Sequence, residues 1–174
     1  MADRPCPFCQ PSDDLNARTI YRSEGWIAVL AAPPNLHGHT VLARSIPGQP
    51  CPRDLDTRSL SGLDDAIATV VPILKRHYSP KHVVFGSLRL IDMHFHVHLF
   101  PVTAKMEQEW RSQMGNGYGA GRFFEFLGHH ERLANEREAQ ERADTGITST
   151  DQLLAWTDRL KFDVEALRRL SGLR

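Results

Sequence analysis

The apolar residues of this chain follow two different spacings, and the change between them marks its secondary structure. Five short segments carry apolar runs or an apolar–polar alternation bounded by turn-forming residues, which is typical of β-strands. They are residues 19–22, 26–30, 39–44, 83–90 and 93–102. Between the third and the fourth, over residues 57–78, apolar positions recur every three or four residues. This spacing predicts an amphipathic helix, which Pro72 kinks or ends.

The order of these elements predicts an α+β fold. The first three strands are joined by short links, as antiparallel neighbours require, and a helix and two further strands follow. We therefore expect an antiparallel sheet of about five strands with one main helix packed on it.

The character of the chain changes beyond residue 105. A glycine-rich segment (115–121) and a charged run of helix-forming residues (122–143) come first, and the charged run is typical of a solvated helix face. A capping-box pattern then starts at Ser149, in front of an apolar stripe with helical spacing over residues 153–167. We expect a first domain over residues 1–105 and a helical C-terminal extension over residues 106–174, packed on or beside the same core.

Composition and charge limit the size, partners and location of the protein. A chain of 174 residues is expected to form one main core. Its 21 lysines and arginines balance 21 aspartates and glutamates, so no overall field attracts long nucleic acids or an anionic membrane. A phosphate ligand therefore has to be held locally. No apolar run approaches the roughly 20 residues of a membrane span, and no signal-peptide segment begins the sequence, so we expect a cytoplasmic protein.

The last predicted strand contains three histidines in strict alternation, in His94-Phe-His96-Val-His98-Leu-Phe-Pro101. Because side chains alternate on a strand, the three imidazoles are expected on one face, about 6.6 Å apart, with the apolar residues in the core. Neutral imidazole is available near pH 7 to attack an electrophile or to bind a metal. An ordinary half-exposed strand face carries mixed polar residues instead. The row of histidines thus predicts a catalytic or metal site.

The cysteines point to a metal. Their number, three, argues against a disulfide framework in a chain without an export signal. Cys6 and Cys9 form a Cys-Pro-Phe-Cys pair, which indicates metal or redox chemistry. A redox pair of this spacing normally stands between a strand and a helix, and no strand precedes this one, so metal binding is favoured.

Together these motifs resemble the histidine triad (HIT) superfamily of nucleotide hydrolases and transferases. The resemblance rests on the alternating histidines that run into Pro101, on Gly38-His39-Thr-Val-Leu, on the cysteine pair and on a helix before the triad strand; it covers roughly residues 5–105. It implies a half-open antiparallel sheet with one main helix, a homodimer, and a nucleotide or nucleotide conjugate as ligand. In such a protein His96 attacks the α-phosphorus and forms a covalent nucleotidyl-histidine. His98 contacts the phosphoryl oxygens or the leaving group, and His39 lies beside the triad.

The resemblance also implies a structural zinc ion. In zinc-containing members, the first triad histidine is a ligand together with the paired cysteines and a histidine shortly after the Gly-His strand. The corresponding stretch here, residues 43–50, contains no histidine, and Cys51 follows it. The implied ligands are therefore Cys6, Cys9, Cys51 and His94. The alternatives are that Cys51 is a loop thiol and that the metal is absent or is bound with His77 or His82.

Several positions depart from the family pattern. Ala31 or Ala32 stands where an acidic or amide residue would bind ribose, and residues 85–92 form a truncated version of the phosphate-binding loop. A basic residue after the proline is also replaced, by Val102-Thr103. Arg44, Arg89 or the segment 105–111 are alternative sources of phosphate contacts.

Three functions remain open at this stage. The first is an enzyme that hydrolyses a nucleotide conjugate, or transfers its nucleotidyl group, through His96. The second is a nucleotide-binding module of the same fold with weak or no catalysis. The third is a metal-dependent hydrolase whose catalytic metal is held by the three histidines.

Overall fold

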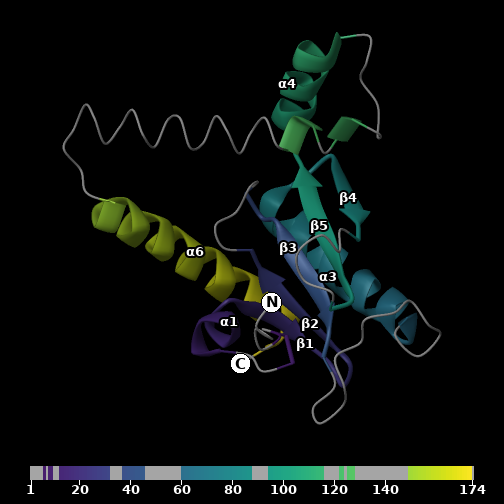
Figure 1. The fold of residues 1–174 in the computed structure, drawn as a ribbon, viewed down its shortest axis with the longest axis vertical. Coiled ribbons are helices and arrows are strands. Elements are labelled where there is room, and N and C mark those ends of the chain that lie inside the picture. The colour runs from purple at the N-terminus through teal and green to yellow at the C-terminus, as the bar shows by residue number, and fades with distance from the viewer. Residues whose placement is uncertain are drawn as a thin grey trace, which may run out of the picture.

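The computed structural model describes residues 6, 8–9, 12–31, 37–45, 60–87, 94–115, 122–123, 125–127 and 149–173. Figure 1 shows its elements, which in chain order are α1 (Asp13–Ala17), β1 (Thr19–Arg22), β2 (Trp26–Leu30), β3 (Thr40–Arg44), α3 (Leu63–Tyr78), β4 (His82–Gly86), β5 (His96–Val102), α4 (Ala104–Met114) and α6 (Ser149–Ser171).

The five strands form one antiparallel sheet in the order β1-β2-β3-β5-β4, which confirms the predicted α+β class and the number of strands. β3 and β5 are neighbours, although α3 and β4 separate them in the chain. Their register pairs Val41 with His98 and Ala43 with His96. This pairing brings the strand that follows Gly38-His39 beside the strand of alternating histidines.

The main core lies between the sheet and two helices, α3 and α6. Figure 1 shows α3 crossing behind the sheet. From the sheet, the core contains Trp26, Ala28, Leu42, Val97 and Leu99; from the helices, it contains Val70, Leu74, Val164 and Leu167. Because side chains alternate along β5, His96 and His98 lie on the opposite face of the sheet.

The histidine-bearing face has smaller apolar clusters of its own. Phe8 and Leu15 cover Ile27, Val29 and Ala43 in the middle of the sheet. At the far end of β5, a second cluster joins that strand to α4 and the residues after it, and consists of Phe100, Val102, Trp110, Phe123, Phe126 and Leu127. The face of the sheet that carries the histidines is therefore covered by Phe8 in one cluster and by several aromatic residues in the other.

α6 is tied to the body of the protein by its apolar stripe and by one arginine. Leu160 packs against the main core, and Val164 and Leu167 are buried in it, as the helical spacing predicts. Arg168 donates hydrogen bonds to the carbonyl oxygens of Asn16, Ala17 and Thr19, at 2.7 to 3.2 Å. The division of the chain at residue 105 stays a prediction, but α6 shares its core with the sheet.

Several element boundaries differ from the sequence prediction, including that of β4, which ends at Gly86 where the predicted strand ran to residue 90. The strand predicted over residues 93–102 begins at His96, so His94 precedes the strand. α3 continues through Pro72 to Tyr78, the predicted end, so of the two alternatives for Pro72, a kink or an end of the helix, the end is wrong. Proline removes one helical hydrogen bond, but burial of Val70, Ile73 and Leu74 holds the helix on the sheet on both sides of it. The predicted helix over 122–143 and the glycine segment lie mostly outside the described residues.

Candidate active site

Three of the predicted site residues meet on one face of the sheet. His96 and His98 project from β5, and His39, which immediately precedes β3, lies beside them. Nε2 of His39 is 2.9 Å from Nδ1 of His98, and Nε2 of His98 is 3.1 Å from Nε2 of His96. His39 and His96 are buried and His98 is half-buried. The pairing of β3 with β5 produces this contact between residues 59 positions apart.

One arrangement of protons satisfies all of these contacts when the rings are neutral. Nδ1 of His96 is 2.7 Å from the carbonyl oxygen of His94, which only accepts, so this nitrogen carries the proton. Nε2 of His96 then holds a lone pair and accepts from Nε2–H of His98. Nδ1 of His98 in turn accepts from Nε2–H of His39. The hydrogen bonds thus run in one direction, from His39 through His98 to His96.

Burial keeps His39 and His98 uncharged at neutral pH. The pKa of His98 is lowered from 6.5 to about 4, first by burial and then by the nearby His96. The pKa of His39 is lowered to about 3 by burial, with smaller contributions from His98 and His96. Neutral rings are what the directional hydrogen bonds require.

Aromatic rings fix the orientation of the imidazoles. Phe100 stacks on His39, with ring centroids 4.4 Å apart, and also on His98, at 5.8 Å. Phe8 lies 5.9 Å from His96 on the other side. A further contact was not foreseen from the sequence: the Ser87 hydroxyl donates to the backbone oxygen of His96 at 2.8 Å. The sequence placed Ser87 inside the strand predicted over residues 83–90, which gave no signal for this contact.

The ring of His94 lies against the two cysteines, and Phe8 contacts both this ring and that of His96. Its Nε2 donates to the backbone oxygen of Arg44 at 2.5 Å, which leaves a lone pair on Nδ1. Nδ1 lies 3.2 Å from Sγ of Cys6 and 3.4 Å from Sγ of Cys9. The three histidines are therefore not equivalent, because His94 stands before the strand and turns to a different set of neighbours.

Cys6, Cys9 and His94 have the geometry of three ligands of a tetrahedral zinc ion. Their ligand atoms all lie within 4.8 Å of one another. With usual zinc–sulfur and zinc–nitrogen bond lengths, a tetrahedral site places sulfur and nitrogen about 3.5 Å apart, close to the two distances found here. The hydrogen bond from His94 to a backbone carbonyl is the outer contact that metal-bound histidines normally make. The three residues thus fit a metal ion.

The fourth ligand is not found among the described residues. Cys51, the predicted one, lies outside them. The two alternative histidines are engaged elsewhere: His77 donates to Asp163 at 3.0 Å, and His82 lies 3.6 Å from Glu107. Within the described part of the chain, Cys6, Cys9 and His94 form the one group with metal-binding spacing.

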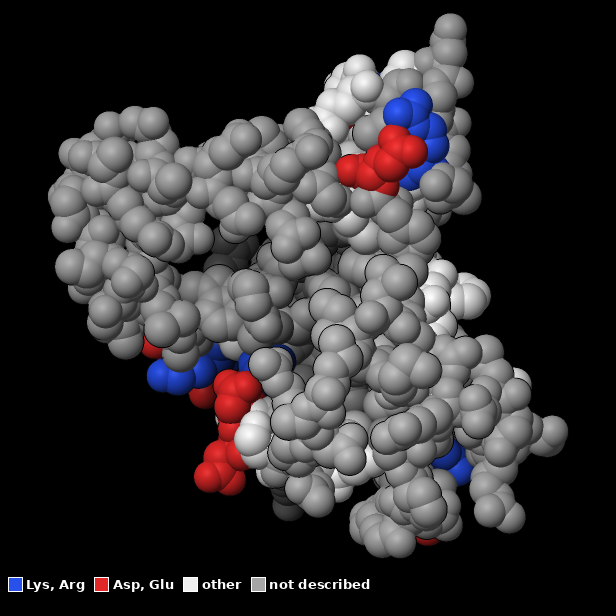
Figure 2. Space-filling model, in the orientation of Figure 1, with Lys and Arg blue, Asp and Glu red and all other residues white. Residues whose placement is uncertain are grey.

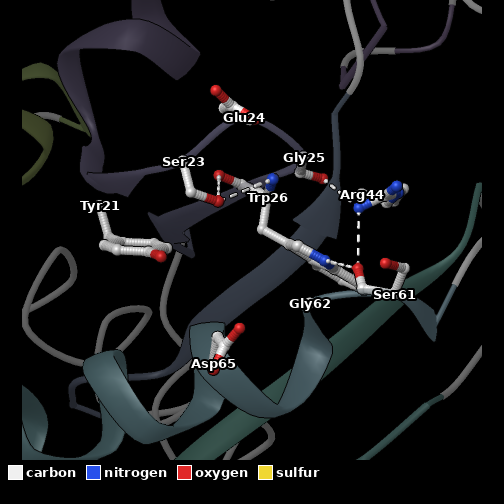
Figure 3. Close-up of a pocket in the computed structure, with 9 residues that line it drawn as sticks. All are labelled: Tyr21, Ser23, Glu24, Gly25, Trp26, Arg44, Ser61, Gly62 and Asp65. Atoms are coloured by element: carbon white, nitrogen blue, oxygen red, sulfur yellow. Dashed lines mark hydrogen bonds between the residues drawn. The ribbon is translucent and has the colours of Figure 1, made fainter.

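Arg44, an expected source of phosphate contacts, is on the wrong face of the sheet. It lines a pocket of about 440 Å³ between the β1–β2 turn and the start of α3 (Figure 3). Its Nη1 donates to the backbone oxygens of Ser61, at 3.0 Å, and of Gly25, at 3.3 Å. The guanidinium also lies over the ring of Trp26, which belongs to the core under α3. Arg44 therefore braces the α3 side of the sheet, and Arg89 lies outside the described residues.

The cations of the segment 105–111 pair with carboxylates of the same helix. Nη2 of Arg111 is 2.6 Å from Glu107, and Nζ of Lys105 is 4.0 Å from Glu109. Figure 2 shows acidic and basic side chains side by side at this end of the molecule. Lys105 and Arg111 thus each have a carboxylate of their own helix beside them.

Comparison with known proteins finds similarity at the level of structure. No protein-family model and no curated protein matches the chain. A HIT-like protein involved in cell-cycle regulation from Bartonella henselae is similar over 50% of this chain and 67% of its own, with 20% identity and a TM-score of 0.44. A hypothetical histidine triad nucleotide-binding protein from Sulfolobus tokodaii is similar over 74% and 89%, with 16% identity and a TM-score of 0.44. A histidine triad protein from Bradyrhizobium japonicum is similar over 70% and 94%, with 16% identity and a TM-score of 0.42.

Two of these structures are named histidine triad proteins and the third a HIT-like protein. For this chain, the superfamily stays the prediction made from its sequence motifs. Among the described residues, no helix combines the length and the apolar character needed to cross a membrane.

Proposed function

We propose that this chain is a nucleotide hydrolase or nucleotidyl transferase that acts at the α-phosphate of a nucleotide conjugate through His96. One observation carries the proposal: Nδ1 of His96 is bound to the backbone oxygen of His94, so that Nε2 holds a lone pair. That nitrogen faces the other histidines and no backbone group, which is the arrangement a nucleophilic imidazole needs.

The reaction proceeds in two displacements. In the first, the Nε2 lone pair of His96 bonds to the α-phosphorus, and the bond from phosphorus to the leaving group breaks, with its electron pair going to the leaving group. In the second, the oxygen of water or of an acceptor attacks phosphorus and loses its proton, and the nitrogen–phosphorus bond breaks to restore His96. The hydrogen bond from Nδ1 to the His94 carbonyl is kept throughout and stabilises the positive charge on the ring of the intermediate.

His98 and His39 have supporting roles in this mechanism. In the resting site, Nε2–H of His98 donates to Nε2 of His96. When that nitrogen bonds to phosphorus, the N–H of His98 is released for a phosphoryl oxygen or the leaving group. Its lowered pKa means that His98 is uncharged at neutral pH, so it donates a hydrogen bond as a neutral group. His39 holds the other nitrogen of His98 and so fixes this direction.

We also propose that Cys6, Cys9, His94 and Cys51 hold a structural zinc ion. The ion would connect the N-terminal segment to the start of β5 and fix the His94 carbonyl that orients His96. Thiolate ligands are stable in a reducing compartment, which agrees with the cytoplasmic location expected from the sequence.

A second candidate is a nucleotide-binding module with weak catalysis. The observation that favours it is the environment of Ala31, whose backbone N–H donates to the backbone oxygen of His39 at 2.8 Å. The backbone of Ala31 thus adjoins that of His39, and the resemblance expects an acidic or amide residue for ribose where Ala31 or Ala32 stands. The third candidate, a catalytic metal on three histidines, is not supported, because both ring nitrogens of His94 have other neighbours.

Replacement of the nucleophile tests the proposal. The probe is a panel of adenosine 5′-monophosphate conjugates with phosphate, acyl and amine leaving groups, labelled at the α-phosphorus. His96→Gly should lower turnover at least about 10³-fold and abolish an acid-labile labelled adduct on the denatured protein. His82→Asn is the control, because His82 is on β4 and contacts Glu107 of α4.

Two outcomes would decide against the enzyme. Turnover that survives His96→Gly would exclude His96 as the nucleophile. Tight binding of the probes by the wild-type chain, without turnover of any of them, would favour the binding module instead.

We further propose that the protein is a homodimer that pairs along β4. β4 is at the edge of the sheet, and in the described part of the chain only one side of it is paired. Its Phe85 is 65% exposed, although it lies opposite the fully buried Leu99. An exposed strand edge with an aromatic residue is a ready interface, and the same edge on a second copy is its simplest complement.

A further inference from the structure

A carboxylate of the C-terminal helix lies between two histidines from other parts of the chain. Asp163 of α6 is almost fully buried. Its Oδ2 accepts from Nε2 of His37 at 2.8 Å, and its Oδ1 accepts from Nε2 of His77 at 3.0 Å. His37 precedes β3, and His77 is in the last turn of α3. One side chain thus links three elements, over separations of 126 and 86 residues.

The same contact packs against the turn that leads to His39. The ring of Tyr78 is 4.9 Å from that of His37 and 4.6 Å from that of His77, in edge-on contact with both. Gly38 has a φ of +82°, and a Cβ on it would lie 2.7 Å from the Tyr78 ring. The backbone of residues 37–39 is therefore held closely against the end of α3.

His39 depends on its backbone for its position. Its Nε2 donates to His98, but its buried Nδ1 has no hydrogen-bond partner among the described residues. The ring is oriented by stacking on Phe100 and by the backbone on either side. On one side, the His39 carbonyl accepts from the N–H of Ala31. On the other, the hydroxyl of Thr40 donates to the carbonyl oxygen of Gly38 at 2.9 Å, and the side chain of His37 bonds to Asp163 of a different element.

Stability alone explains Asp163 poorly. Replacing a buried ion pair with apolar side chains is often neutral or stabilising, because desolvation of the charge offsets the attraction. α6 is already held by the burial of Val164 and Leu167 and by the three bonds of Arg168. The hydrogen bonds of Asp163 to His77 and to the half-exposed His37 add only a modest net stabilisation to that attachment, because each replaces bonds to water.

We infer that Asp163 is a positioning residue for the catalytic histidines: it holds His37, and thereby keeps His39 aligned on His98. The inference rests on the proposed function of these histidines. It gives the C-terminal helix a role in the site, although Val164 and Leu167 of α6 pack in the core on the face opposite His96 and His98.

A double-substitution cycle separates positioning from simple attachment of the helix. Asp163→Asn, His37→Ala and the two together are compared with Arg168→Ala, which loosens the same helix without touching His37. The readouts are kcat and KM with the labelled adenosine conjugates, the melting temperature, and the ring ¹⁵N resonances of His39 and His98, which report their tautomers.

If Asp163 acts through His37, each single variant should lower kcat on the order of tenfold with little change in KM. The double variant should lose no more than Asp163→Asn alone, because the two residues form one link. The ring resonances of His39 and His98 should shift in all three variants. Arg168→Ala should lower the melting temperature and leave kcat and the ring resonances unchanged.

Other outcomes would contradict the positioning role of Asp163. If the variants lower only the melting temperature, and the ring resonances of His39 and His98 stay as in the wild type, Asp163 serves stability alone. If Asp163→Asn does not fold, His37→Ala decides, because His37 is half exposed. The ring resonances need no turnover, so a wild-type chain without activity but with shifted resonances in the variants would overturn the proposed function and keep the positioning role.

Discussion

Four histidines in this site have the same side chain and different chemistry, because each has different neighbours. His94 turns a lone pair to two thiols, and His96 turns one to His98. His98 and His39 act as directed donors in a buried row. In each case a backbone carbonyl or another imidazole selects the tautomer, and the tautomer decides what the ring can do.

Burial of the neutral histidines predicts an acid-sensitive fold. In the unfolded chain, His39 and His98 take up protons below pH 6.5, whereas in the folded protein their pKa values are about 3 and about 4. Their contribution to stability is therefore complete above pH 6.5 and is lost as the pH falls toward 4 and below. We expect the free energy of unfolding, measured with urea, to decrease between pH 6.5 and pH 5.

A variant isolates the contribution of one ring. His98→Asn removes a titrating group, so its stability should depend less steeply on pH over the same interval, in which carboxyl groups of ordinary pKa hardly titrate. Equal slopes for the variant and the wild type would show that His98 titrates normally in the folded chain.

The cysteines predict a second measurable property. Purified protein should contain about one zinc ion per chain by elemental analysis, as four protein ligands imply. Cys9→Ser should lose the metal, because Cys9 faces His94. Cys51→Ser tests the fourth ligand: a metal content unchanged by this substitution would mean that Cys51 is not a ligand.

At the scale of elements, the turn before β3 is the most constrained connection. Gly38 needs a positive φ, and its backbone touches the ring at the end of α3. Glycine is the residue that meets both demands, since any side chain would meet the Tyr78 ring. The Gly-His motif seen in the sequence is thus partly a packing requirement between a turn and a helix.

Gly38→Ala should destabilise the protein by about 2–4 kcal/mol, as the sum of backbone strain and overpacking. Gly115→Ala is the matched control: Gly115 also has a positive φ, +50°, but no atom lies within 4 Å of an added Cβ. It should cost about 1–2 kcal/mol from strain alone. Similar losses in urea unfolding would mean that the Tyr78 ring moves aside without cost.

In the molecule as a whole, the edge strand β4 carries an exposed aromatic residue, Phe85. Phe85→Glu should shift the oligomer to monomers in sedimentation velocity, since a charge opposite its symmetry mate is repulsive. Phe162→Glu on α6 introduces the same charge at a residue 63% exposed and should leave the oligomer unchanged. A wild-type chain that sediments as a monomer would contradict the proposed dimer.

Most of the fold could be read from local pattern. The sequence by itself determined the strands, the main helix, the α+β class and the grouping of three histidines, because period 2 and period 3.6 are properties of neighbouring residues. It also indicated that Cys6 and Cys9 are ligands of a metal ion. At Pro72, the sequence predicted a kink or an end of the helix. The helix does not end there, because burial of its apolar face outweighs one lost hydrogen bond.

The different roles of the histidines depend on tertiary contacts. Three contacts decide these roles: His94 with Cys6, His39 with His98, and Asp163 with His37. Each joins residues far apart in the chain. Arg44 likewise looked available for phosphate, and the structure shows it bound to carbonyls on the opposite face. A ring's tautomer and a cation's partner depend on which atoms the fold brings within 3 Å, and no spacing along the sequence contains that information.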